Sequence, residues 1–252
     1  MNKKMVSVDF WNTLVKADSN ADKRAQARMN AVRDLARYHG MKLTDEAIRH
    51  SREQLSRAFD EEWFGRQRTQ TTEYLAREMI RLLAIPASPK EIDELADFFR
   101  ESLFLGPPEP AEGIKEALET LSNYYHLSII SDTMFSPGSV IRKYLDHLEV
   151  LSFFDAFAFS DELGVSKPHS KAYETVLNAT GARPERSWHV GDMLKTDIKG
   201  ARAVGMKCIL YTGFSDQDTS RDNNNHNNGS PEADFECKTW DAVADILISE
   251  LR

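Results

Sequence analysis

The spacing of hydrophobic residues changes twice along the chain. Residues 5–9 form a short apolar run, which predicts a buried strand that ends in the carboxylate of Asp9. Between residues 20 and 105 the apolar residues recur at helical spacing, and no strand pattern interrupts them. After residue 106 short apolar runs alternate with helical stretches. The pattern predicts an α/β protein in which a bundle of helices is inserted into a Rossmann-like parallel sheet.

The inserted stretch predicts four helices. Apolar residues of the first three recur three or four positions apart or at multiples of that spacing: Met29, Val32 and Leu35; Ile48, Leu55 and Phe59; Leu75, Met79 and Leu82. The segment Ser88-Pro89-Lys90-Glu91 has the capping-box pattern that begins a fourth helix. Gly106-Pro107-Pro108 ends the bundle, because two adjacent prolines cannot continue a helix. Residues 20–106 are therefore expected to form a helical cap domain.

The remaining residues, 1–19 and 107–252, are expected to form one discontinuous Rossmann-like core. Its further strands are predicted at residues 127–131, 156–160, 188–191 and 207–211, with an edge strand at 234–237 and a last helix at 241–251. Residues 215–233 are too polar to supply a packed core, which predicts a flexible surface loop. The connections near residues 14–20 and 106–110 are candidate hinges.

Composition narrows the possible partners. The 252 residues carry a net charge of −8, which argues against a protein that binds nucleic acid or a membrane surface. No apolar run has the length of a membrane span, and no signal peptide follows Met1, so a cytoplasmic location is expected. Cys208 and Cys237 are expected to be buried free thiols. The sequence leaves the oligomeric state open.

Polar residues follow the predicted strands at the edge where open parallel sheets bind ligands. Ser131-Asp132-Thr133 ends the second strand, and its hydroxyl and N–H groups could hold an oxyanion or begin a helix. Lys167 follows the third strand, in front of Pro168. A lysine there could be a surface charge, but near carboxylates it would reduce their repulsion and neutralise a phosphoryl group.

Two carboxylates follow the fourth strand, at Asp192 and Asp197. With Asp9 they would form a set of oxygen ligands that suits a hard cation such as Mg²⁺. Helix capping could explain either acid alone, but it does not explain all three acids at the same edge.

In their order along the chain, these motifs resemble the haloacid dehalogenase superfamily, and the helical insert resembles its helical cap. The resemblance implies that Asp9 is both nucleophile and metal ligand in a Mg²⁺-dependent hydrolase of a small anionic substrate. It further implies that Ser131, Asp132 and adjacent N–H groups bind phosphoryl oxygens, and that Lys167 bridges Asp9 and phosphate. Asp192, Asp197 and the backbone carbonyl of Trp11 would complete the Mg²⁺ site.

Trp11 departs from the pattern of the phosphatase members. They carry at this position an aspartate that protonates the leaving oxygen and then activates water, and indole can do neither. Such catalysis contributes roughly 100- to 10,000-fold, so slow or unusual phosphate chemistry is expected. His169 and His189 are the nearest substitutes, although a helix start and a buried strand explain them more simply.

Two other functions remain open from the sequence. Dehalogenase members also lack the second aspartate, but the retained Asp192 and Asp197 favour Mg²⁺ and phosphate. A phosphate-binding or regulatory protein with impaired turnover is the other alternative. Substrate specificity is expected at residues 62–68, where Arg66 and Arg68 could bind an anion or could simply be solvated.

Overall fold

The core of the protein is a six-stranded parallel sheet, in a computed structural model that describes residues 4–214 and 232–251. The strands lie in the order β5-β4-β1-β6-β7-β8, so that β1 has a neighbour on each side. Their bounds are β1 Lys4–Val8, β4 Tyr125–Ser131, β5 Phe154–Phe159, β6 Ser187–Gly191, β7 Lys207–Tyr211 and β8 Phe235–Cys237. The expected parallel sheet and its edge strand are confirmed. β4 begins two residues earlier than predicted, at Tyr125, which is buried and donates its hydroxyl to the Leu247 carbonyl.

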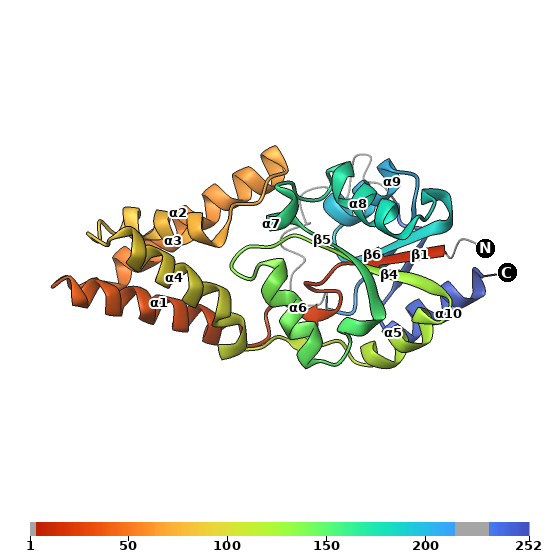
Figure 1. The fold of residues 1–252 in the computed structure, drawn as a ribbon, viewed down its shortest axis with the longest axis horizontal. Helices are drawn as coiled ribbons and strands as arrows, with labels where there is room; N and C mark the ends of the chain where they lie inside the picture. The colour runs from red at the N-terminus through yellow and green to blue at the C-terminus, as the bar shows by residue number, and fades with distance from the viewer. Residues whose placement is uncertain (1–3, 215–231, 252) are drawn as a thin grey trace.

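Helices cover both faces of this sheet (Figure 1). On one face pack α5 (Ile114–Ser122), α6 (Gly138–His147) and α10 (Trp240–Ser249), whose apolar residues share a core with the strands. On the other face α8 (Ser170–Thr180) and α9 (Lys199–Ala203) bury a second cluster. The sheet is therefore a middle layer that fixes the positions of the loops at its carboxyl edge.

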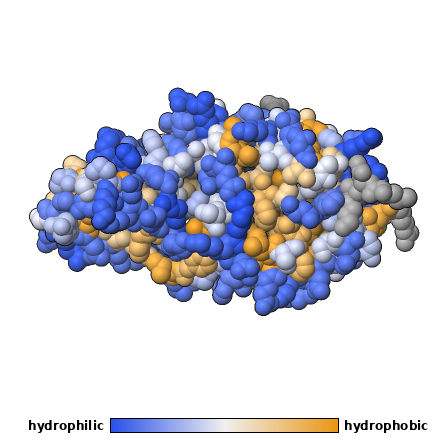
Figure 2. Space-filling model, viewed as in Figure 1, coloured by the Kyte–Doolittle hydropathy of each residue, from blue (hydrophilic) through white to orange (hydrophobic). Residues whose placement is uncertain are grey.

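Four helices form the insert, as the sequence predicts. They are α1 (Ala21–Tyr38), α2 (Asp45–Asp60), α3 (Thr72–Leu82) and α4 (Pro89–Glu101). Their apolar stripes pack into a core of their own, which includes Val32, Leu55, Leu75 and Phe99. The bundle lies beyond the carboxyl ends of the strands (Figure 1), and hydrophilic residues dominate its visible outer surface (Figure 2).

The two connections between sheet and bundle are bound to each other. Val15–Lys16 (β2) pairs with Glu109–Pro110 (β3) as a small antiparallel ribbon. Arg24, at the start of α1, donates to the backbone carbonyls of Ala17, Ser19 and Gly106. One buried guanidinium thus holds both crossings in place. The division into two domains with hinges here stays a prediction.

Short elements complete the described chain. They are the π-helical turns η1 (Glu61–Gly65) and η5 (Leu194–Ile198), the 3-10 turns η2 (Ser102–Leu105), η3 (Leu151–Phe153) and η4 (Pro184–Arg186), and the single-turn helix α7 (Ser160–Leu163). Cys208 and Cys237 are buried free thiols, as expected. Most of the loop predicted at 215–233 lies outside the described residues. Within the described ranges, no helix combines the length and apolar character needed to cross a membrane.

Candidate active site

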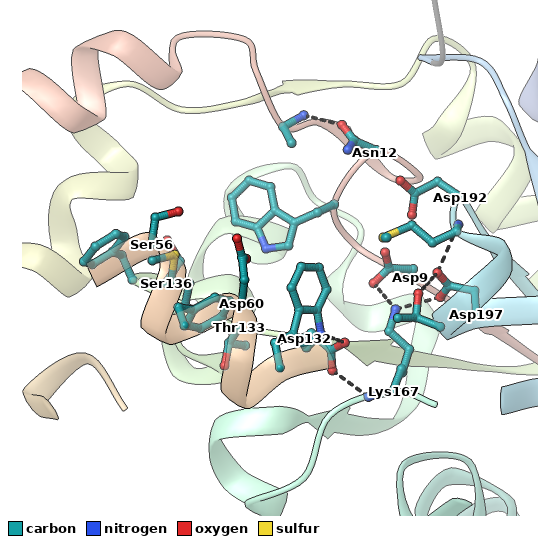
Figure 3. A pocket seen from close by; sticks show the side chains of 18 of the residues that line it. Asp9, Asn12, Ser56, Asp60, Asp132, Thr133, Ser136, Lys167, Asp192 and Asp197 are labelled. Carbon is teal, nitrogen blue, oxygen red and sulfur yellow. Dashed lines mark hydrogen bonds and ion pairs between the residues drawn. The ribbon is translucent and has the colours of Figure 1, made fainter. Parts of the chain in front are cut away.

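Most of the polar residues singled out in the sequence converge at the carboxyl edge of the sheet (Figure 3). Asp9 directly follows β1, and its N–H donates to the Val190 carbonyl of the neighbouring strand at 2.9 Å. Lys167 comes from the loop after α7, and Asp192 directly follows β6. Parallel pairing brings these strand ends to one side, so residues distant in sequence become neighbours.

A cavity of about 260 Å³ opens between this edge and the helical bundle. The core lines it with residues that include Asp9, Asp132, Lys167, Asp192 and Asp197, and the bundle lines it with Arg24, Arg28, Ser56, Phe59, Asp60 and Trp63. Carboxylate side chains therefore dominate the wall formed by the sheet, whereas the wall formed by the bundle includes two arginines.

Lys167 is the central cation of the site. Its side chain is 3% exposed, and its ammonium Nζ lies 2.8 Å from Asp9 Oδ1 and 2.7 Å from Asp197 Oδ1. Burial alone would lower the pKa of Lys167, but the charges of Asp197 and Asp9 raise it well above the usual value. The lysine is therefore a permanent cation between two carboxylates, as its expected role requires.

Asp197 is the most firmly held acid. Its Oδ1 accepts from Lys167 and lies 2.9 Å from His189 Nε2, while its Oδ2 accepts from Thr196 Oγ1 and the Met193 N–H. Burial would raise the pKa of Asp197, but Lys167 and His189 hold it well below its usual range. A Cβ at Gly191 would lie 2.4 Å from the Asp197 carboxyl carbon, so only glycine permits this close approach.

The acids also fit a divalent cation. Asp9, Asp192 and Asp197 each present a carboxylate oxygen within 4.8 Å of the others. Burial raises the pKa of Asp9 to about 6, and burial together with the charges of Asp197 and Asp9 raises the pKa of Asp192 well above its usual value. Asp9 Oδ1 is buried and, apart from the ion pair with Lys167, has no well-aligned donor among the described residues. A hard cation would offset this concentrated negative charge.

The second motif has a different geometry from the expected one. Ser131 is buried and does not line the cavity; its Oγ lies 3.5 Å from the Asp132 carbonyl. The Asp132 carboxylate lines the cavity, but it accepts from the Lys167 N–H at 3.0 Å and from Trp63 Nε1 at 2.8 Å. Asp132 thus positions the lysine loop and contacts the bundle. Phosphoryl binding by Ser131 and Asp132 stays a prediction.

Trp11 lines the cavity and packs edge-to-face on Phe10, with ring centroids 4.9 Å apart. The Mg²⁺ contact expected of its backbone carbonyl stays a prediction. His169 accepts from the Lys171 N–H at the start of α8, so it caps a helix. His189 is fully buried and hydrogen-bonded to Ser7 and Asp197. Both histidines follow the simpler interpretation from the sequence.

Arg66 and Arg68 are not brought to the cavity. Both are exposed, and Arg66 pairs with Glu62 at 2.6 Å because the two residues stand one helical turn apart. Trp63 reaches the site from the same segment instead. Sequence reasoning also missed Arg28, although a cation one turn before the apolar residue Val32 on the buried side of α1 was a usable signal.

The fold and this constellation of a lysine among carboxylates at the sheet edge define a hydrolase of the Rossmann-like α/β class. The family model of haloacid dehalogenase-like hydrolases matches residues 33–211, and the chain belongs to this family.

Curated relatives and solved structures extend the comparison. Glyceraldehyde 3-phosphate phosphatase of Pyrococcus furiosus is 29% identical over 210 residues, which is 82% of this chain and 80% of the relative. Phosphoglycolate phosphatase of Aquifex aeolicus is 27% identical over 55% of this chain and 65% of its own length. The crystal structure of 2-haloacid dehalogenase from Pseudomonas syringae has a TM-score of 0.71 at 20% identity, over 98% of this chain and 99% of that one. That of the HAD phosphatase from Thermococcus onnurineus has a TM-score of 0.64 at 21% identity, over 97% of each chain. These two crystal structures show that their proteins share the fold of this chain.

Proposed function

We propose that the protein is a Mg²⁺-dependent phosphatase that acts on a small phosphate ester through Asp9. The observation that carries the proposal is the buried contact of Lys167 with Asp9 and Asp197 inside the cavity. Lys167 partly offsets the charge on Asp9, which keeps the carboxylate available as a nucleophile beside an anionic substrate. The similarity to phosphatases that act on glyceraldehyde 3-phosphate and phosphoglycolate supports a small substrate.

In the first step, a carboxylate oxygen of Asp9 attacks phosphorus, and the bond from phosphorus to the alcohol oxygen breaks. The departing oxygen takes a proton and leaves as the alcohol. Water then attacks phosphorus of the aspartyl-phosphate, which releases inorganic phosphate and restores the Asp9 carboxylate. Through both steps, the ammonium of Lys167 stabilises negative charge on the phosphoryl oxygens.

Asp9 and Asp192 are the acids best suited to ligate Mg²⁺, with Asp197 as a third oxygen donor. Because Asp197 already accepts from Lys167 and its neighbours, its main contribution is to orient the lysine. When bound, the cation would supply positive charge that reduces repulsion between Asp9 and the phosphoryl group. The same charge would favour the ionised forms of Asp9 and Asp192.

Trp11 sets the limit on turnover. With no carboxyl at this position, the leaving oxygen has to take its proton from water or from the substrate itself. We therefore infer slow hydrolysis of alkyl phosphates and faster hydrolysis of aryl phosphates, whose leaving groups need less help from an acid.

The test compares wild type, Asp9→Asn and Trp11→Asp with p-nitrophenyl phosphate, alkyl phosphates and 2-haloacids, with and without Mg²⁺. Wild type is expected to release phosphate only with Mg²⁺, and Asp9→Asn is expected to be inactive. Trp11→Asp is expected to gain roughly 10-fold or more on alkyl phosphates, within the range of general acid catalysis. Asp93→Asn, an exposed acid on α4, is the matched control.

Equal activity of wild type and Asp9→Asn would reject the nucleophile. Halide release that depends on Asp9 but not on Mg²⁺, without phosphate release, would assign the chain to dehalogenation. Tight phosphate binding without any turnover would instead identify a binding or regulatory protein.

A further inference from the structure

The wall that the bundle contributes to the cavity contains two arginines with different surroundings. Arg24 is engaged with backbone carbonyls of the two connections. Arg28 stands one turn later on α1, where its Nη1 donates to Ser102 Oγ at 2.9 Å and its guanidinium carbon lies 4.3 Å from the Phe135 ring centroid. Among the residues that the structure describes, no carboxylate lies within 4.0 Å of either guanidinium. Arg28 is therefore a half-buried cation that lines the cavity without an acidic partner.

Positive charge continues into a second cavity that shares Arg28 with the first. Arg49 and Arg52 of α2 also line this second cavity. Glu53 is the single acid in its lining, and its carboxylate lies 3.8 Å from Arg57 in an exposed pair. Three arginines thus face one acid, although the whole chain carries a net charge of −8.

The arginines repel one another in the absence of an anion. Burial, followed by the charges of Arg24 and Arg52, lowers the pKa of Arg28 to about 10. The guanidinium remains charged at neutral pH, yet its charge is poorly offset. Guanidinium groups present parallel N–H donors that match a carboxylate or a phosphate. An anion at Arg28 would relieve the repulsion and satisfy these donors.

We propose that Arg28, with Arg52 near it, is a second anion-binding subsite that recognises a carboxylate or phosphate other than the group transferred to Asp9. The substrate is then a small phosphate monoester with a second acidic group at its far end. Asp60 lines the same wall and repels an anionic end, but the two arginines of that wall, Arg24 and Arg28, attract it. This inference rests on the proposed phosphatase function.

The test uses phosphoglycolate, ethylene glycol bisphosphate and the singly acidic ethyl phosphate with wild type and Arg28→Gln. Loss of a charge-assisted hydrogen bond predicts that KM for the first two esters rises about 10- to 100-fold. The value of kcat/KM for ethyl phosphate is expected to stay within about threefold, because that ester makes no contact with the subsite. A larger effect on either doubly acidic ester identifies whether carboxylate or phosphate is preferred, and both results support the subsite.

Two control variants and one replacement variant accompany Arg28→Gln. Arg66→Gln removes an exposed arginine outside the cavity and should change no KM. Arg28→Lys keeps the charge and should recover part of the loss. If Arg28→Gln does not fold, Arg52→Gln takes its place, with an expected rise in KM of about 3-fold for the doubly acidic esters alone.

A measurement without turnover separates this inference from the proposed function. Phosphonoacetate should raise the melting temperature of wild type more than ethylphosphonate does, and Arg28→Gln should abolish the difference. That outcome without any phosphate release would retain the subsite and reject the phosphatase. Equal losses on all three esters, or equal shifts by both phosphonates in wild type, would overturn the subsite and leave the proposed function standing.

Discussion

The two walls of the cavity differ in how completely their charges are paired. On the wall formed by the sheet, Lys167 contacts two carboxylates, and Asp197 has a donor for each of its oxygens. On the wall formed by the bundle, Arg28 donates to the Ser102 hydroxyl and lies over the Phe135 ring, but it forms no ion pair with an acid among the described residues. The first arrangement holds its charged groups in fixed positions, whereas the second leaves a cation whose charge an anionic ligand could offset.

This difference follows from how each wall is built. Strand ends place the acids, since the parallel register of β1 with β4 and β6 leaves little freedom for the residues that follow. The helical bundle packs around its own core, and Met134 and Phe135 of the loop after β4 pack against that core. Trp63 and Thr69 of the bundle also hydrogen-bond to the sheet loops. The bundle side of the cavity is therefore placed by helix packing rather than by strand pairing.

Lys167→Met, which removes the cation from the sheet wall of the cavity, should have the largest effect on activity and stability. The substitution keeps much of the side-chain volume but leaves Asp9 and Asp197 close together without a cation. Removal of one partner of a buried ion pair costs about 3–5 kcal/mol, and loss of the positive charge should reduce kcat by about 100- to 1,000-fold. Phosphate release and thermal unfolding measure the two effects.

Lys199→Met is the matched control for this substitution, because Lys199 is exposed on α9. It should leave both quantities unchanged. Retention of wild-type kcat by Lys167→Met would contradict the role given to the lysine.

His189→Phe tests whether Asp197 needs its second donor. Phenylalanine keeps the edge-to-face packing against Tyr173 but removes the group 2.9 Å from Asp197. Loss of one of the donors to the buried Asp197 carboxylate, and of the His189 partner of the buried Ser7 hydroxyl, predicts a loss of about 1–3 kcal/mol in the free energy of unfolding. His126→Phe removes an exposed ion pair with Asp155 and should cost less than about 1 kcal/mol.

The pH dependence of the His189→Phe variant provides a second check. The pKa of Asp197 is depressed in the folded protein, so the carboxylate stabilises the fold above its unfolded pKa of about 3.8. This contribution is lost as the pH falls through the folded pKa. The difference in unfolding free energy between wild type and variant should therefore be greatest near neutral pH and should narrow below about pH 4. A constant difference would show that Asp197 is not the group affected.

Sequence patterns predicted the residues that line the sheet wall of the cavity better than those that line the bundle wall. Asp9 and Asp192 directly follow strands, Lys167 lies in the loop between β5 and α8, and parallel topology brings these strand ends together whatever lies between them in sequence. Ser131 shows the limit of this reasoning. The strand end was located correctly, but side-chain direction alternates along a strand, and the hydroxyl is buried outside the cavity lining.

The bundle residues were harder to predict because helix docking depends on tertiary packing. Charge and exposure at an interhelix turn suggested Arg66 and Arg68, but Trp63 of that turn reaches the core and Arg28 comes from a different helix. Arg24 and Arg28 stand one helical turn apart and so share a face of α1, but the spacing alone does not indicate that this face meets the cavity.

The affinity for Mg²⁺ should fall at low pH, because protons compete with the cation for the carboxylates of the sheet wall. Burial raises the pKa of Asp9 to about 6, so its carboxylate is mostly ionised at pH 7 and mostly protonated at pH 5. The apparent Kd for Mg²⁺ is expected to be about tenfold weaker at pH 5. Tryptophan fluorescence can follow the titration, since Trp11 lines the cavity. Asp9→Asn should reduce the dependence without abolishing it, because the pKa of Asp192 is raised as well. Equal wild-type affinities at both pH values would argue against Asp9 as a ligand.

Trp63→Phe should give the smallest effect, because it alters one hydrogen bond between the two walls. Phenylalanine keeps an aromatic ring against Phe64 but cannot donate to Asp132 Oδ2, which the indole reaches at 2.8 Å. Asp132 also accepts from the Lys167 N–H, so its carboxylate links the bundle to the lysine loop. Loss of this hydrogen bond predicts a rise in KM of about 3- to 10-fold with a smaller change in kcat, since Lys167 keeps its contacts with Asp9. A fall in kcat with unchanged KM would show instead that the indole helps to position the catalytic lysine, and the two walls would then act as one unit.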